Sequence, residues 1–140
     1  MTTPETARSQ IMRAIHSKDT QPELVVRRVL YALGYRYRLH RKSLPGSPDL
    51  VFSRRRKVIF VHGCFWHGHD CKRGARKPKS NADYWQSKIA RNRARDARSV
   101  GELESAGWEI MTVWECELRS SERAALTSRL VDFLGPTAII

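Results

Sequence analysis

The sequence predicts an α/β domain in which a mixed β-sheet is flanked by helices. The 140 residues are enough for one domain and too few for two ordinary ones. Hydrophobic residues make up 41% of the chain, which excludes a disordered tail and allows a core without disulfides. Hydrophobic periodicity then changes along the chain in the order α, β, β, β, α, β, α. No apolar run approaches the roughly 18 residues of a membrane span, and the first ten residues lack a signal peptide's apolar segment, so we expect a cytoplasmic protein without membrane contacts.

The first helix is predicted to begin after Thr20 and to run to residue 33. Thr20 can cap the helix, Pro22 suits its first turn, and Glu23 would complete a capping box. Gly34 ends it. Residues 35–40 then alternate aromatic or aliphatic side chains with arginine and histidine, which predicts a half-exposed strand with a basic outer face.

Two more strands are predicted after a turn-rich loop over residues 44–48. Residues 49–52 form a short strand, and residues 53–56 form a charged turn. Residues 57–61 are continuously apolar after the lysine, which is typical of a central strand.

The second half of the chain begins with an irregular segment over residues 62–80, rich in Gly, His, Cys and Lys. A helix over residues 83–106 would direct Ile89 and Leu103 inward and end at Gly107. The remaining elements are a strand over residues 108–114 and an amphipathic helix over residues 121–134.

The charge is strongly basic and unevenly placed. The chain carries 26 Lys and Arg against 14 Asp and Glu, a net charge of +12. Residues 1–98 hold 23 of the basic and seven of the acidic residues. A polyanion is therefore the expected partner, with nucleic acid as the first candidate. The alternative is a generally basic, soluble surface.

Two groups of side chains could contact nucleic acid. The first lies on one face of the long helix at spacings of three and four, where it could grip phosphates; it comprises Lys88, Arg91, Arg93, Arg95 and Arg98. A solvated helix face is the alternative, weakened by the missing acidic partners. The second group could stack on bases or wedge between them, or be buried in the core; it comprises Phe65, Trp66 and Trp85.

Asp49 is a candidate ligand for a hard cation. It follows Pro48 at the edge of a short strand and faces the next apolar strand. One carboxylate and a main-chain carbonyl can suffice for Mg²⁺, which keeps several waters. The alternative is an ordinary turn residue or strand cap.

The segment HGCFWHGHDC, residues 62–71, is dense in metal ligands. Cys64, His69 and Cys71 could bind Zn²⁺, and Cys116, the remaining cysteine, could complete the set. The spacing departs from C-x₂-C, so the alternative of Cys64 and Cys116 as small buried apolar residues stays open.

If His69 binds zinc, His62 and His67 remain as candidates for a catalytic role. A neutral imidazole is the usual general base for activating water, and Glu23 or Asp96 could orient it. The alternative is a structural or surface histidine.

Several motifs together resemble the very short patch repair (Vsr) family of DNA mismatch endonucleases. They are KDT (18–20), YRYRLH (35–40), LPGSPD (44–49), HGCFWHGHDC (62–71) and VWEC (113–116), and the similarity spans roughly residues 8–134. The resemblance implies a restriction-endonuclease-like fold with a structural zinc site. It also implies a nickase that cuts 5′ of the thymine in T·G mismatches, which arise by deamination of 5-methylcytosine.

The resemblance also implies residue roles. Asp49 and the main-chain carbonyl of Val61 would hold the catalytic Mg²⁺, and His67 would be the general base. In the family pattern Thr can occupy the position of Val61, and any role of a Thr hydroxyl is absent here. The orienting and assisting residues would be Asp96, Glu23 and His62. Structural zinc would be held by Cys64, His69, Cys71 and Cys116. The DNA wedge would be Phe65, Trp66 and Trp85, and the segment reaching across the DNA would contribute Arg8, Arg13 and Lys18.

We therefore expect a single domain over residues 1–140, with residues 1–19 contacting DNA and residues 20–134 forming the nuclease core. The expected partners are duplex DNA with a T·G mismatch, mismatch-repair proteins and a companion cytosine methyltransferase, in the nucleoid of a bacterial cytoplasm. A monomer is expected because a nick needs one active site. The alternatives are a zinc-stabilised DNA-binding module without cleavage and a nuclease of different DNA specificity. Asp49 together with His67 discriminates against the binding module, which needs neither.

Overall fold

A computed structural model describes residues 20–65, 67, 69, 71 and 82–137. The predicted DNA contacts Arg8, Arg13, Lys18 and Trp66 lie outside these described residues. The main elements are α2 (Gln21–Ala32), β1 (Arg38–Leu39), β2 (Leu50–Phe52), β3 (Lys57–His62), α3 (Ala82–Ser105), β4 (Glu109–Trp114) and α4 (Arg123–Leu134). Two 3₁₀ helices, η1 (Glu115–Leu118) and η2 (Ser120–Glu122), connect β4 to α4.

The four strands form one mixed sheet in the order β1-β2-β3-β4. Strands β1, β2 and β3 are antiparallel neighbours, and β3 pairs with β4 in parallel. This parallel pair, joined through α3, runs from Lys57 opposite Glu109 to His62 opposite Trp114. The carboxyl ends of β3 and β4 therefore lie side by side at one edge of the sheet.

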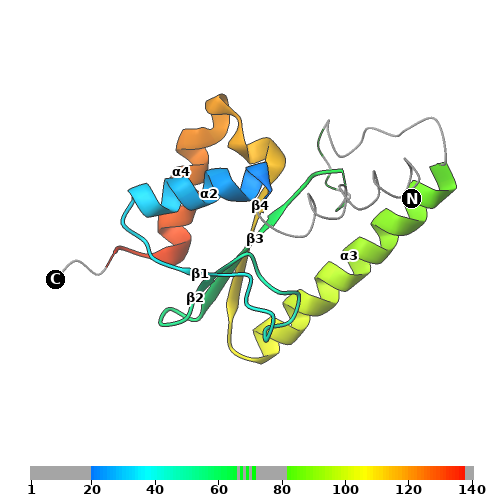
Figure 1. The fold of residues 1–140 in the computed structure, drawn as a ribbon, viewed down its shortest axis with the longest axis horizontal. Coiled ribbons are helices and arrows are strands. Elements are labelled where there is room, and N and C mark those ends of the chain that lie inside the picture. Colours follow the sequence, from blue (N-terminus) through cyan, green and yellow to red (C-terminus); the bar gives the residue numbers. More distant parts are fainter. Residues whose placement is uncertain (1–19, 66, 68, 70, 72–81, 138–140) are drawn as a thin grey trace, which may run out of the picture.

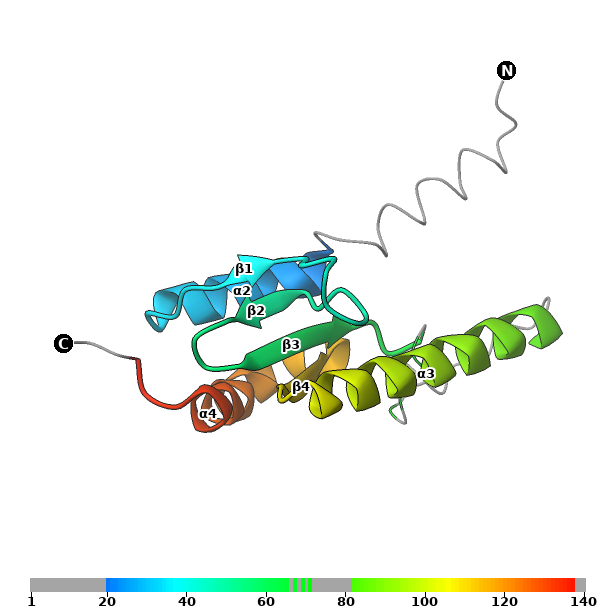
Figure 2. The same ribbon diagram turned by 90° about the horizontal axis from the view of Figure 1, so that it is seen from below.

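Helices cover both faces of the sheet, as the sequence predicted (Figures 1 and 2). Helices α2 and α4 pack on one face and α3 on the other. Alternation along the strands divides the core accordingly: Leu50 and Ile59 face α2 and α4, whereas Val51 and Val58 pack with Leu103 of α3.

The helix ends follow local signals in the sequence. Thr20 Oγ1 accepts the Glu23 amide at 3.4 Å and caps α2. At the end of α3, Gly107 has φ +89°, and the Trp108 amide bonds the Leu103 carbonyl at 3.0 Å, as in a Schellman motif. The predicted second half of the capping box is wrong, because the Glu23 carboxylate faces inward to His40.

The predicted strand over residues 35–40 is shorter than expected. Only Arg38 and Leu39 pair with β2. His40 follows the strand in the left-handed region with φ +47°. Leu39 is 40% exposed, contrary to the predicted alternation, and His40 points inward to Glu23 instead of contributing to the basic outer face.

The charged turn between β2 and β3 lies at the opposite edge of the sheet from the ends of β3 and β4. Arg55 donates to the Leu134 carbonyl at 2.7 Å, and Arg56 donates to the Ala106 carbonyl at 2.8 Å. These carbonyls lie at the ends of α4 and α3, so the two arginines satisfy helix C-termini.

Candidate active site and metal centre

Three clusters of titratable side chains lie around the carboxyl ends of β3 and β4. Within each cluster the potential ligand atoms lie within 4.8 Å of one another. We call them the Cys/His cluster (Cys64, His69, Cys71 and Cys116), the histidine cluster (His62, His67 and Asp96) and the carboxylate cluster (Glu23, His40 and Asp49).

The Cys/His cluster joins the segment after β3 to the turn after β4. The Cys116 amide donates to Cys64 Sγ at 3.4 Å, and Cys116 Sγ lies 3.7 Å from His69 Nδ1. Burial raises the pKa of the Cys64 thiol to about 12 and also raises that of Cys116. Ionisation of these thiols therefore needs a cation, and a set of three sulfurs and one imidazole suits Zn²⁺.

The histidine cluster fixes the orientation of one imidazole. His67 Nδ1 lies 2.5 Å from Asp96 Oδ2, and its ring stacks on that of His62 at 3.7 Å and 3°. Burial, helped by His67, lowers the pKa of His62 to about 3, so His62 is neutral. Burial tends to raise the pKa of Asp96, but the hydrogen bond and charge of His67 outweigh it, and the pKa is lowered.

The carboxylate cluster brings α2 against the start of β2. The Val61 amide donates to Asp49 Oδ2 at 2.7 Å. His40 Nε2 lies 2.8 and 2.9 Å from the two Glu23 carboxylate oxygens, and Arg27 also pairs with Glu23. Burial, reinforced by the nearby Glu23, raises the pKa of Asp49 to about 7 despite the Val61 amide. Its oxygen donors suit a hard cation such as Mg²⁺.

A cavity of about 390 Å³ connects the last two clusters. Asp49 and Val61 line it together with His67 and Asp96. Gly46 forms part of its wall with φ +74°, and a Cβ there would lie 2.8 Å from Ser99 of α3, so only glycine fits. A candidate metal-binding carboxylate and an oriented imidazole therefore open into one space, as metal-assisted hydrolysis requires.

Comparison with known proteins agrees with this chemistry. The profile of the family described as DNA mismatch endonuclease Vsr matches residues 1–73. The type II nicking enzyme V.XorIIP of Xanthomonas oryzae pv. oryzae is 53% identical over 130 residues, which is 93% of each chain. The DNA mismatch endonuclease Vsr of Escherichia coli is 42% identical over 130 residues, 91% of this chain and 83% of that protein. This chain belongs to the Vsr family.

Membership in the Vsr family confirms the resemblance and the restriction-endonuclease-like fold predicted from the sequence. The chain is an endonuclease, and DNA is its partner. A nuclease of this family implies a divalent metal, and the clusters above include residues that could hold one. None of the described helices has the length and hydropathy of a membrane-spanning segment.

Aromatic side chains gather near the first turn of α3 in this Vsr-family endonuclease. The rings of Phe65 and Trp85 lie 5.7 Å apart at 65°, and Tyr84 lies 5.0 Å from Trp85. Tyr84 is 53% exposed and extends this aromatic group into solvent. Tyr84 was not among the residues predicted to contact DNA, although it directly precedes Trp85.

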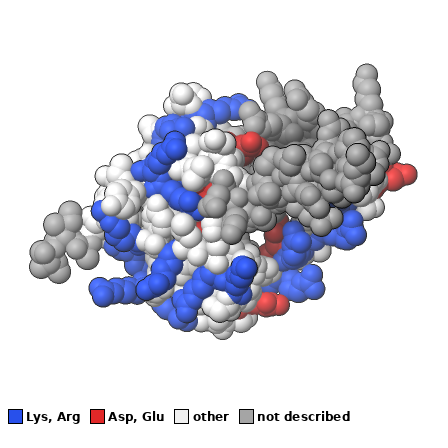
Figure 3. All heavy atoms as spheres, viewed as in Figure 1, with Lys and Arg blue, Asp and Glu red and all other residues white. Residues whose placement is uncertain are grey.

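Basic side chains accompany this aromatic group along α3. Arg91 and Arg95 are exposed and Lys88 is half-buried. Arg95 also lines the cavity beside Asp96. On the face shown in Figure 3, blue Lys and Arg side chains are spread over the described residues, with few acidic side chains among them.

His40 is a second site residue that was not predicted from the sequence. Its alternation with Arg36 and Arg38 predicted an outward position, and no local signal marks the left-handed backbone that turns it toward Glu23. The structure brings His40 together with Glu23 and Asp49, three residues from separate segments.

Proposed function

We propose that this endonuclease nicks one strand of duplex DNA 5′ of the thymine in a T·G mismatch, in a Mg²⁺-dependent hydrolysis. The observation that carries the proposal is the shared cavity, where the Asp49 carboxylate and the His67–Asp96 pair meet. The names of the relatives support it, since they include type II nicking enzymes and a DNA mismatch endonuclease.

Asp49 would hold Mg²⁺ together with the main-chain carbonyl of Val61. The two residues are already adjacent, because the Val61 amide bonds the Asp49 carboxylate. The bound cation would supply Lewis acidity that offsets charge on the phosphate and the leaving oxygen. A main-chain contact requires no hydroxyl at position 61, so Val is compatible with this role.

His67 would accept the proton of the attacking water. Asp96 holds Nδ1 of this imidazole, which fixes the ring and stabilises its protonated form. The water oxygen would bond to phosphorus as the phosphodiester bond to the leaving oxygen breaks. His62, neutral and stacked on His67, would assist by keeping the ring in plane, and Glu23 would assist beside Asp49.

The Cys/His cluster would hold a structural Zn²⁺. Cys64 and His69 flank His67 in the chain, and the His69 amide also bonds the Cys64 carbonyl at 2.9 Å. A metal on both flanking residues would therefore hold the general base on a short, rigid segment.

DNA would be gripped and opened by different side chains. Phosphates would be bound by Lys88, Arg91 and Arg95, with Arg8, Arg13 and Lys18 reaching across the duplex. The wedge would consist of Phe65, Trp66 and Trp85. Unstacking costs least at a mispaired step, so an aromatic wedge favours mismatched DNA.

Nicking of labelled duplexes tests the proposal. Duplexes with T·G, C·G and other mispairs in several sequence contexts are incubated with and without Mg²⁺. We expect one cut, in the thymine strand of T·G duplexes, only when Mg²⁺ is present. Equal cutting of C·G duplexes would favour a nuclease of different specificity, and binding without cutting would favour a DNA-binding module.

A further inference from the structure

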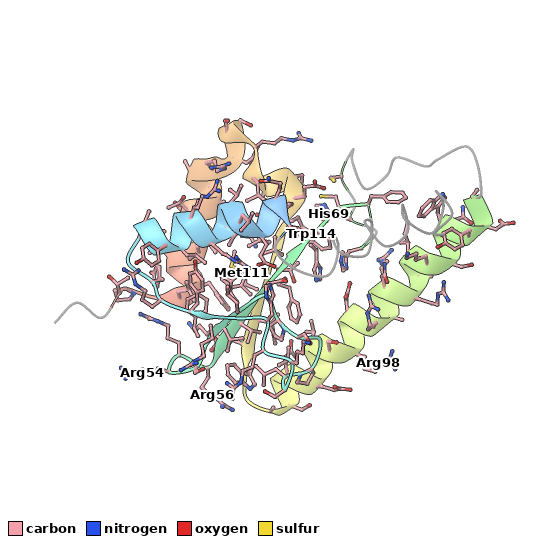
Figure 4. All side chains as sticks on the ribbon, viewed as in Figure 1. Arg54, Arg56, His69, Arg98, Met111 and Trp114 are labelled. Carbon is pink, nitrogen blue, oxygen red and sulfur yellow. The ribbon has the colours of Figure 1, made fainter. Side chains whose placement is uncertain are left out.

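Trp114 stands between the Cys/His cluster and the histidine cluster. It is the last residue of β4 and pairs with His62 of β3 in the sheet register. Figure 4 shows it beside His69 at this end of the sheet. In the sequence Trp114 is the last residue of a predicted strand and part of the VWEC motif, and the proposed function assigns it no role.

Three ring contacts connect its indole to both clusters. The His69 ring stacks on the indole at 4.1 Å and 14°. The His62 and His67 rings meet the same indole edge-on, at 5.4 Å and 73° and at 6.4 Å and 70°. The indole therefore has a predicted zinc ligand on its face and the predicted general base beside it.

The backbone of Trp114 is tied to the Cys/His cluster as well. Its amide donates to Glu117 Oε1 at 3.0 Å, which closes the first turn of η1. This turn carries Cys116, whose amide bonds Cys64 Sγ. A displacement of the indole relative to this turn would change the separation between the two clusters.

We propose that Trp114 is a positioning residue whose indole sets the spacing between the Cys/His cluster and the imidazole of His67. The inference rests on the proposed function, in which His67 is the general base. Asp96 holds His67 from α3, and His62 stacks on one face of its ring. The indole packs against this stacked pair from β4, so that the ring is held from three elements.

Trp108, at the other end of the same strand, shows the surroundings of a tryptophan in the apolar core. It directly precedes β4, is 6% exposed, and packs with Val58 and Leu103. Trp114 belongs to neither apolar core cluster of the described residues, and its three ring contacts given above are all with histidines. Trp108 thus packs in the apolar core, whereas the indole of Trp114 lies against side chains of the site. Trp108→Phe is therefore a matched control for Trp114→Phe.

The test compares Trp114→Leu, Trp114→Phe, Trp108→Phe and His67→Ala in the full chain. Each variant is measured for zinc content, for affinity toward a T·G duplex, and for the single-turnover nicking rate on saturating duplex with Mg²⁺. Displacement of a catalytic group by about 1 Å can cost about 10²-fold in rate. We expect Trp114→Leu to keep its zinc and duplex affinity while nicking about 10–100-fold more slowly.

An aromatic ring should restore most of this loss if the indole acts as a spacer. We expect Trp114→Phe to nick about threefold to fivefold more slowly than the unmodified protein, a smaller loss than that of Trp114→Leu because the ring is partly replaced. Trp108→Phe should nick at the unmodified rate below its melting temperature. If Trp114→Leu does not fold, the nicking rates of Trp114→Phe and Trp108→Phe test the inference instead. Equal rates for these two variants overturn it.

The outcomes separate this inference from the proposed function. Unchanged nicking by Trp114→Leu, with nicking lost in His67→Ala, overturns the spacer role and leaves the proposed function standing. Loss of zinc from Trp114→Leu also overturns it, because the indole would then support the metal site itself. Unchanged nicking by His67→Ala overturns the proposed function.

Discussion

Charged side chains serve opposite purposes at the two ends of β3. We call the start of β3, next to the turn that joins it to β2, the hairpin edge of the sheet. At the hairpin edge, Arg55 and Arg56 donate to carbonyls at the ends of α4 and α3. At the other edge, past His62, titratable side chains face one another and a cavity. Figure 4 places Arg54 and Arg56 at the first edge and His69 and Trp114 at the second.

The difference teaches how to tell structural charge from functional charge. A cation beside a helix C-terminus stabilises the fold by about 0.3–1 kcal/mol and has its partners in the backbone. At the cavity, burial raises the pKa of Asp49 to about 7 and lowers that of His62 to about 3. Such opposed shifts cost stability and are typical of sites that bind or transform a ligand. Substitutions at the two edges should therefore affect different measurements.

The largest effect is expected for Cys116→Ala, which removes one ligand of the Cys/His cluster. Metal binding at a structural site is coupled to folding and contributes several kcal/mol. We expect lost zinc and a large drop in melting temperature, read by atomic absorption and circular dichroism. A stable variant, or an unmodified protein with three free thiols and no metal, would contradict the structural zinc site.

Asp49→Asn should abolish most nicking without unfolding the protein. A general base contributes about 10²–10⁴-fold in rate, and loss of the catalytic cation should cost at least as much. The Val61 amide can still donate to the new amide oxygen, so zinc content and duplex affinity should persist. Nicking assays and zinc analysis check this, and a rate within tenfold of the unmodified protein would argue against the role.

Mg²⁺ affinity should depend on pH through Asp49. The folded pKa, about 7, lies above the usual value of 3.8, so at pH 6 the carboxyl is mostly protonated and the cation must displace a proton. Below this pKa the affinity should fall about tenfold for each pH unit. Calorimetric titrations with Mg²⁺ at pH 6, 7 and 8 measure it, and equal affinities at all three values would refute it.

Arg55→Ala tests the hairpin edge and should lower stability without lowering the nicking rate. It removes hydrogen bonds to the carbonyls of Leu134 and Pro136 at the end of α4. We expect a loss of about 1–2 kcal/mol in the free energy of unfolding. Nicking below the melting temperature should be unchanged. Arg54→Ala is the matched control, because Arg54 is an exposed residue of the same turn. Reduced duplex affinity for Arg55→Ala would show that this edge also meets DNA.

The smallest effect is expected for Arg91→Ala on α3. Removing one phosphate contact should weaken matched and mismatched duplexes alike and reduce the slope of log affinity against log salt by about one. The free energy of unfolding should not change, in contrast to Arg55→Ala. Fluorescence anisotropy at several salt concentrations measures the slope, with Arg54→Ala again as control. Identical slopes for both variants would contradict a phosphate contact by Arg91.

Local signals in the sequence determined most of the secondary structure. The Thr20 cap bounds α2, Gly107 ends α3, and alternation or continuous apolar runs mark β2, β3 and β4. These features depend on residues within one turn or one strand, so composition and spacing suffice to predict them. The predicted helix over residues 121–134 differs only in its beginning, where residues 120–122 form a 3₁₀ turn.

The candidate site also has a part that the local sequence predicts and a part that only the tertiary structure shows. Cys64, His67 and His69 stand within one short segment, so the sequence marked them as candidates for a metal site and a general base, and the family resemblance implied the role of each. Only the tertiary structure decided that His40 turns inward to Glu23, and that Trp114 reaches both clusters. It likewise decided that the arginines of the hairpin turn cap distant helix ends. These contacts join residues far apart in the chain, and their geometry follows from sheet register and helix packing, which no local pattern encodes.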